Sequence, residues 1–97
     1  MPAAPSFPEP KWLESLPEAD RPAARLRWIL EIAAAYASPE GTMTILSRLC
    51  DKSDSTVGKA KFDGQISARL AIKIEEVLGR DIMPREVICP EFFQIKA

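Results

Sequence analysis

The chain has 97 residues, of which 46% are hydrophobic and 28% are charged, and its formal net charge is −1. This length and composition predict one globular domain and exclude a disordered or fibrous chain. The absence of histidine excludes the catalytic pairs, triads and zinc sites that depend on that residue.

The first segment of the chain, residues 1–18, is rich in proline and is predicted to be an extended or loosely packed arm. Residues 19–97 then form the folded domain with its C-terminal tail. Trp12, Leu13 and Leu16 are the exception within the arm, because their spacing fits one amphipathic turn. Two interpretations stay open: the segment folds back over the domain, or it is a peptide arm that binds a partner protein.

A long helix is predicted over Arg21–Ala37. Asp20 is the expected N-cap, Pro22 suits the first turn, and Pro39 and Gly41 end the helix. Its apolar residues cover an arc of roughly 200°, wider than the stripe of somewhat over ~100° that a surface helix buries. The residues that make up this arc are Leu26, Trp28, Ile29, Leu30, Ile32, Ala33, Tyr36 and Ala37. The apolar surface beyond that width must be covered by the N-terminal segment, by a second copy of the chain, or by both.

The segment Met43–Phe62 reads as two short helices joined by a tight polar turn. Thr42 or Thr44 caps the first helix, and Ser53 is the predicted N-cap of the second. The first helix is expected to bury Ile45, Leu46, Leu49 and Cys50, and the second to bury Val57, Ala60 and Phe62. This pattern predicts a helix-turn-helix, whose second helix would lie in the major groove of DNA.

The rest of the chain predicts further helices and a tail. Asp63 and Gly64 mark a turn, after which Ser67 caps a helix over Ala68–Leu78 that Gly79 closes. This helix is expected to pack behind the helix-turn-helix as its scaffold. Residues 84–89 suggest one short helical turn, and residues 91–97 form the tail. The predicted fold class is therefore all-α, a small domain of about five helices.

Several short stretches together resemble the Cro-like helix-turn-helix regulators of the YdaS-like prophage family, over about Gly41 to Phe93. The matching stretches are Leu46-Ser47-Arg48-Leu49-Cys50-Asp51, Ser53 with Val57, Gly64-Gln65-Ile66-Ser67, Ile74-Glu75 and Pro90-Glu91-Phe92-Phe93. The departures from the family pattern are Asp51 for the turn glycine, Lys52 for an apolar residue and Ala60 for tryptophan. The resemblance implies a lambda-repressor/Cro-like fold and a Cro-like role on DNA.

The predicted DNA contacts come from the start of the second motif helix and from nearby cations. Short hydroxyl side chains suit phosphates or bases, Asp54 can accept from cytosine, and Lys59, on the face of Ser55, points at guanine or a phosphate. Thr44 would direct a hydroxyl and backbone N–H groups at a phosphate. The full set is Thr44, Arg48, Lys52, Ser53, Asp54, Ser55, Thr56, Lys59 and Lys61. The alternative interpretation of these residues is a polar, solvated helix face.

The predicted function is that of a sequence-specific transcriptional regulator of phage or prophage type, with repression as the expected mode, acting as a homodimer on double-stranded DNA. The expected dimer or partner surface consists of Trp12, Trp28, Ile32, Tyr36, Phe92 and Phe93. The alternative is a protein-interaction module, an antitoxin, antirepressor or host-takeover factor, that uses the same fold.

The remaining expectations concern compartment and chemistry. Cys50 and Cys89 are too few and too far apart for a metal site and are expected to be reduced, structural thiols. No apolar run approaches the ~20 residues of a membrane span, and the N-terminus lacks the pattern of a signal peptide. We therefore expect a cytoplasmic protein that is not an enzyme and has no metal or cofactor.

Overall fold

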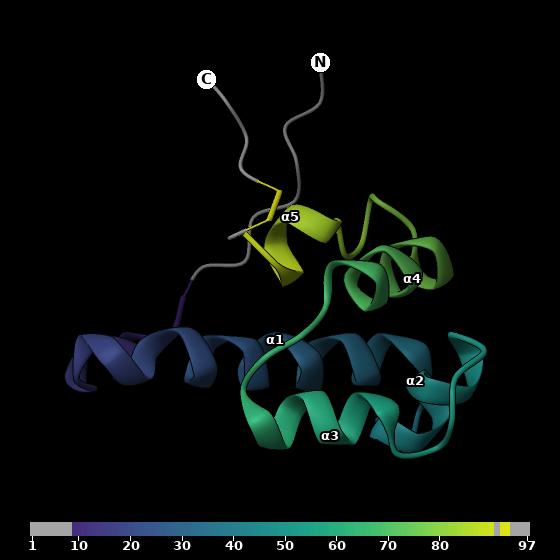
Figure 1. The fold of residues 1–97 in the computed structure, drawn as a ribbon, viewed down its shortest axis with the longest axis horizontal. Coiled ribbons are helices and arrows are strands. Elements are labelled where there is room, and N and C mark those ends of the chain that lie inside the picture. Colours follow the sequence, from purple (N-terminus) through teal and green to yellow (C-terminus); the bar gives the residue numbers. More distant parts are fainter. Residues whose placement is uncertain (1–8, 91, 94–97) are drawn as a thin grey trace.

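In the computed structural model, residues 9–90, 92 and 93 are described, and within them the chain forms helices and no strand (Figure 1). This confirms the prediction of a small all-helical protein. The elements are the 3-10 helices η1 (Lys11–Ser15) and η2 (Glu18–Asp20) and the α-helices α1 (Arg21–Ala37), α2 (Met43–Leu49), α3 (Thr56–Asp63), α4 (Ala68–Leu78) and α5 (Arg85–Ile88).

Helix α1 is the element on which the others pack, with α2 and α3 on one side of it and α4 and α5 on the other (Figure 1). Its bounds and the position of Pro22 in its first turn confirm the prediction. The expected capping role of Asp20 is wrong, because its side chain accepts no hydrogen bond from the helix. The chain that leads into α1 is fixed instead by Arg21, whose guanidinium donates to the backbone carbonyls of Glu14 and Leu16, each at 3.0 Å.

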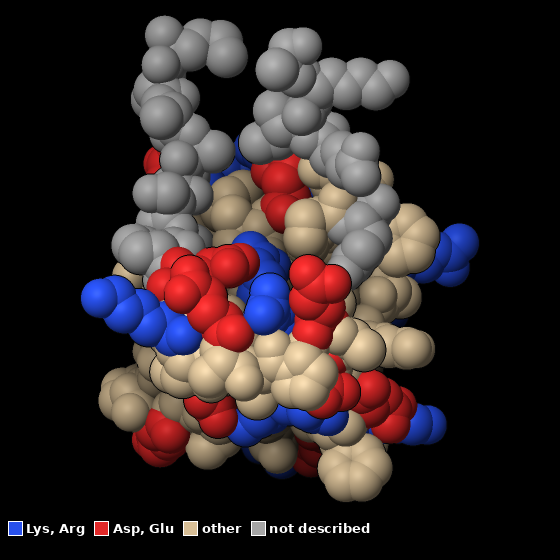
Figure 2. Space-filling model, turned by 90° about the vertical axis from the view of Figure 1, so that its left-hand side faces the viewer, with Lys and Arg blue, Asp and Glu red and all other residues tan. Residues whose placement is uncertain are grey.

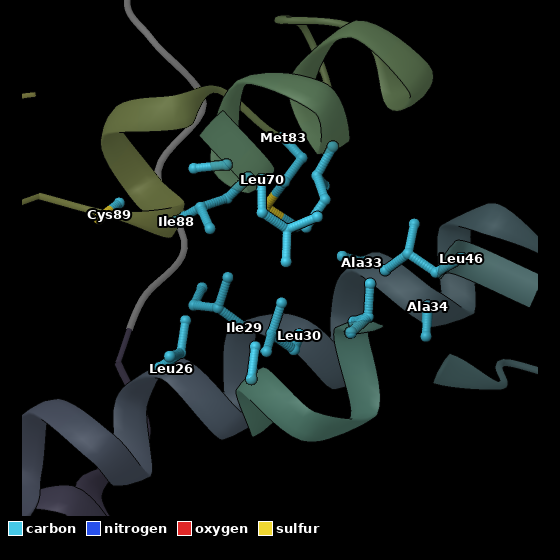
Figure 3. Packing of buried hydrophobic residues seen from close by; sticks show 14 of the residues in the cluster. Leu26, Ile29, Leu30, Ala33, Ala34, Leu46, Leu70, Met83, Ile88 and Cys89 are labelled. Atoms are coloured by element: carbon cyan, nitrogen blue, oxygen red, sulfur yellow. The ribbon is translucent and has the colours of Figure 1, made fainter. Parts of the chain in front are cut away.

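The core lies along the inward face of α1 (Figure 3). Ile29 and Leu30 point toward the side of α1 that holds Leu70 and Met83. The other helices each add a buried apolar residue, and these are Leu46, Val57, Ile74 and Ile88. Burying a side chain of this size stabilises the fold by about 1.5–3 kcal/mol, so the arrangement of α2 and α3 depends directly on α1.

The described part of the N-terminal segment folds back on α1 and buries Leu13, while Trp12 stays half exposed. Residues 1–8 of the predicted arm lie outside the described residues. On the outer part of α1, Trp28 and Ile32 are partly buried against the core, and Tyr36 is exposed. The chain itself therefore covers most of the wide apolar arc and leaves Tyr36 exposed.

Helix α4 begins and ends where the sequence predicted. The Ser67 hydroxyl accepts from the backbone N–H of Leu70 at 3.1 Å, and Gly79 follows the last residue of the helix at a positive φ of 94°. The predicted turn after Pro84 is α5, and Phe93 beyond it packs against the core with Arg85 over its ring. Phe92 is exposed. Glu91 and residues 94–97 lie outside the described residues.

A buried carboxylate joins α4 to α5. Glu75, only 4% exposed, accepts from the backbone N–H of Arg85 at 2.7 Å and from its guanidinium at 2.8 Å. Arg80 donates to the same carboxylate at 2.7 Å and also pairs with Glu86. Helix α5 has no side-chain cap of its own. The carboxylate of Glu75, in α4, accepts from the first backbone N–H of α5 and so takes the place of that cap. The hydrogen bond from the Arg85 side chain holds the pKa of Glu75 below its usual value.

Candidate nucleic-acid interface

The connection between α2 and α3, residues 50–55, begins with a tight turn at Asp51. Its φ is +58°, in the left-handed region that glycine usually occupies and that Asp tolerates better than most residues. The backbone N–H of Asp51 donates to the carbonyl of Arg48, and that of Lys52 to the carbonyl of Ser47, both at 3.0 Å. These two bonds form a Schellman motif at the end of α2. Asp51 thus performs the conformational role for which the resemblance expects glycine.

A buried hydroxyl fixes α3 against α2. The Ser47 hydroxyl donates to the carbonyl of Met43 at 2.8 Å and accepts from the backbone N–H of Val57 at 2.9 Å. The expected N-cap role of Ser53 is therefore wrong: α3 begins at Thr56, and its capping oxygen comes from the preceding helix. The Ser53 hydroxyl instead lies 2.8 Å from that of Thr56. The Thr42 hydroxyl caps α2 by accepting from the backbone N–H of Ile45. Of the two predicted caps, Thr42 and Thr44, the first is therefore confirmed.

Ser47→Ala is expected to lower the free energy of unfolding by about 2 kcal/mol, because it leaves a buried backbone donor of α3 without an acceptor. Ser53→Ala is the matched control, and its effect should stay within about 0.5 kcal/mol because that hydroxyl is exposed. Urea unfolding of both variants measures the difference. Equal losses would contradict the assignment of the cap to Ser47.

The buried faces of the two helices differ from the predicted ones. In α2, Ser47 is buried with Leu46, while Leu49 is half exposed. In α3, Val57 and Ala60 point inward as predicted. Phe62 is 83% exposed, so its assignment to the core is wrong. At 100° per residue Phe62 lies 140° from Val57, and an α3 that buries Val57 must turn Phe62 outward.

The exposed side of α3 and its N-cap carries two predicted DNA contacts, Ser55 and Lys59, in line with Phe62, which was not among the predicted contacts. Ser55, Lys59 and Phe62 follow each other at the helical spacing i, i+4, i+7, and all three are exposed. Lys52 is exposed in the turn just before them. Thr44 is also exposed, in the first turn of α2, whereas Thr56 is partly buried. The exposed side of α3 and its N-cap therefore presents a hydroxyl, an ammonium group and an aromatic ring in line, and Lys52 adds a second exposed ammonium group in the turn before them.

Two of the four predicted cationic contacts are already engaged in ion pairs. The Arg48 guanidinium donates to both carboxylate oxygens of Asp54 at 2.8 and 2.9 Å, and this hydrogen bonding holds the pKa of Asp54 below its usual range. Lys61 pairs with Glu31 of α1 at 2.8 Å. Lys52 and Lys59 have no ion pair with any residue in the described part of the chain. They are the cations on this side that remain available to phosphates.

The far end of α3 is tied to α1 by contacts that the sequence did not signal. The Arg27 guanidinium donates to the backbone carbonyls of Lys61 and Phe62 at 3.0 and 3.1 Å. Arg27 and its partners are more than thirty positions apart, so no local pattern could reveal the contact. A Cβ added to Gly58 would meet only the Met43 Cβ, at an ordinary 3.7 Å. The packing of α2 against α3 does not require that glycine.

A groove lies on another part of the surface, between η1, the start of α1 and the segments after α3 and α5. Its volume is about 990 Å³. Leu13, Leu26 and Ile88 are among its apolar lining, and Glu14, Glu18 and Asp63 among its charged lining. Arg25 also lines it but is engaged by Glu9 and by a backbone carbonyl. Figure 2, which views the molecule from the N-terminal end of α1, shows acidic and basic side chains intermixed on this face.

The described residues hold no cluster of acidic or cysteine side chains that would bind a metal ion, and no helix among them is long and apolar enough to cross a membrane. Cys50 and Cys89 are both buried and are not joined by a disulfide. Burial raises the pKa of the Cys50 thiol and disfavours the reactive thiolate. Comparison of the chain with family models, curated proteins and solved structures gave no match.

Proposed function

We propose that this protein is a sequence-specific DNA-binding transcriptional regulator, acting as a repressor, whose helix-turn-helix is formed by α2 and α3. The observation that carries the proposal is the exposed line formed by Ser55 at the N-cap of α3 and by Lys59 and Phe62 on α3. Lys52, in the turn just before it, is a second exposed lysine that, like Lys59, has no ion pair in the described part of the chain. The left-handed turn at Asp51 supports it, because it lets two short helices follow each other closely with only six residues between them.

In this proposal α3 lies in the major groove and Lys52 approaches the phosphate backbone. Lys59 and Ser55 face the base edges, where an ammonium group suits guanine and a hydroxyl suits several bases. Arg48 braces the turn through Asp54 instead of binding a phosphate. Because Lys61 is also paired, one copy makes few phosphate contacts, and two copies on two half-sites supply the affinity. The exposed side chains of Tyr36 and Phe92 are the candidate contacts between copies.

The test is selection from a random pool of duplex DNA, followed by titration of the selected sequence across salt concentrations. Lys52→Ala should weaken binding to all sequences and reduce the salt slope by about 1, as expected for a lost phosphate contact. Lys59→Ala should also reduce the preference for the selected sequence over other sequences. Lys11→Ala, at an exposed position of η1, is the control and should change neither the affinity nor the selected sequence. Failure to select any sequence, or equal binding by all variants, would refute the proposal.

The second candidate function is binding of a partner protein, and the groove beside η1 favours it. Its apolar lining with Glu14, Glu18 and Asp63 is complementary to a cationic amphipathic peptide. Glu14→Lys combined with Glu18→Lys should abolish binding of a synthetic leucine- and lysine-rich helical peptide, measured by tryptophan fluorescence. Glu40→Lys, in the turn after α1, is the control. An unchanged affinity in the double variant would remove this candidate.

A further inference from the structure

The ring of Phe62 has no role in the fold. It is the most exposed of the large apolar side chains in the described part of the chain, whereas Val57 and Ala60 satisfy the core contacts of α3. An aromatic ring held in water forgoes the stabilisation that burial would give. It is the apolar member of the exposed line that it forms with Ser55 and Lys59.

A shallow hollow opens beside this ring. Arg27, Gly58, Lys61 and Phe62 line it. Gly58 lies one helical turn before Phe62, and because it has no side chain the flank of the ring stays open. Adding a Cβ there meets only the Met43 Cβ at 3.7 Å, so the fold itself does not need the open space. The hollow has a volume of about 560 Å³ and one aromatic wall. Arg27 and Lys61 border it, and both are engaged by partners within the protein.

We propose that Phe62 and Gly58 form a site for the C5-methyl group of thymine, and this inference rests on the proposed function. The major groove offers one exposed methyl group, that of thymine, and phenylalanine is among the side chains that contact it. Phe62 follows Lys59 by three residues, about 4.5 Å along the helix. The thymine therefore lies within about two base pairs of the base or phosphate that Lys59 contacts. Phe62 shares the exposed side of α3 with Lys59, which has no ion pair in the described part of the chain, so a polyanion bound by Lys59 also reaches the ring.

The experiment removes the methyl group alone. The duplex selected from the random pool is synthesised with each thymine in turn replaced by uracil, and binding is measured for the wild type, Phe62→Ala, Phe62→Leu and Gly58→Ala. One uracil position within two base pairs of the Lys59 contact should weaken wild-type binding about fourfold, the value of one buried methyl-sized group. Phe62→Ala should bind the thymine and uracil duplexes equally, and Phe62→Leu should keep part of the preference. Gly58→Ala, which adds a methyl group to the lining of the hollow, should reduce the preference.

Ile82→Ala, an exposed apolar residue between α4 and α5, is the control and should keep the wild-type preference. A selected sequence with no uracil-sensitive position, or a preference that survives in Phe62→Ala, would overturn the thymine site while leaving the regulator proposal in place. Failure to select any sequence would count against both. The competing occupant of the Phe62 ring is a second copy of the chain, and sedimentation of Phe62→Ala tests it. If this variant is a monomer where the wild type is a dimer, and the thymine preference is intact, the ring contacts a second copy and the inference is overturned.

Discussion

Replacing Glu75 by glutamine is expected to lower the free energy of unfolding by about 3 kcal/mol, in the range for a buried charge pair that loses one partner. The carboxylate accepts from three donors of Arg85 and from Arg80, and an amide offers one acceptor oxygen and two donors to the same groups. The bonds it makes to α5 are the main polar link between that short helix and α4. Urea unfolding measures the loss.

Glu76→Gln is the matched control for this experiment. Glu76 is the next residue on α4, its side chain is exposed, and its ion pair with Lys73 is long at 3.5 Å. Exposed pairs of this kind contribute about 0–1 kcal/mol, so Glu76→Gln should leave stability nearly unchanged. Similar losses in the two variants would contradict the role assigned to the buried carboxylate.

The same carboxylate gives the fold a defined dependence on pH. Its pKa is lower in the folded protein than the ordinary value of 4.5, chiefly because of the hydrogen bond from the Arg85 side chain. The folded state therefore binds fewer protons, and the stabilisation is present above the unfolded pKa and lost as the pH falls through the folded one. The wild type should lose stability below about pH 4.5, and Glu75→Gln should lose less over the same range. Parallel pH profiles would contradict this expectation.

The second large effect is expected at Gly64, which ends α3 in the left-handed conformation with a φ of +70°. A Cβ at this position would lie 2.5 Å from the Cβ of Ala23 and 3.3 Å from its Cα, in the first turns of α1. Gly64→Ala adds backbone strain of about 1 kcal/mol and overpacking of about 1–3 kcal/mol. We therefore expect a loss of about 3 kcal/mol on urea unfolding, since neither backbone can move away without displacing a helix.

Two further variants separate the strain from the clash. Gly41 has a similar φ of +63°, but a Cβ there meets Ala35 at an ordinary 3.6 Å, so Gly41→Ala should cost about 1 kcal/mol. In an Ala23→Gly background, Gly64→Ala should lose most of its excess cost. The absence of such coupling would show that the close approach of α3 to α1 is not what requires glycine at this position.

Helices whose limits are set by neighbouring residues could be predicted from the sequence. Pro22 and the break at Pro39 bound α1, and Ser67 and Gly79 bound α4, because capping hydrogen bonds, proline geometry and positive φ are local properties. The positive φ of Asp51 was not predicted, because aspartate adopts it less readily than glycine and the sequence indicated only a tight polar turn. In α1 the apolar period extends over more than three turns, and most of its buried residues lie in the predicted arc. Tyr36 of that arc is exposed, and Ala34, outside it, is buried.

The short helices behave differently, and this affects the candidate site. Helices α2 and α3 span about two turns each, so an apolar pattern fits several rotations, and packing against α1 decides which one forms. That packing buries Ser47 as the cap of α3 and turns Phe62 outward. The sequence by itself thus determined the all-helical class and the limits of α1 and α4. Only the tertiary structure decided which cations pair with distant carboxylates and which side chains α3 exposes, because those contacts join residues that are remote in the chain.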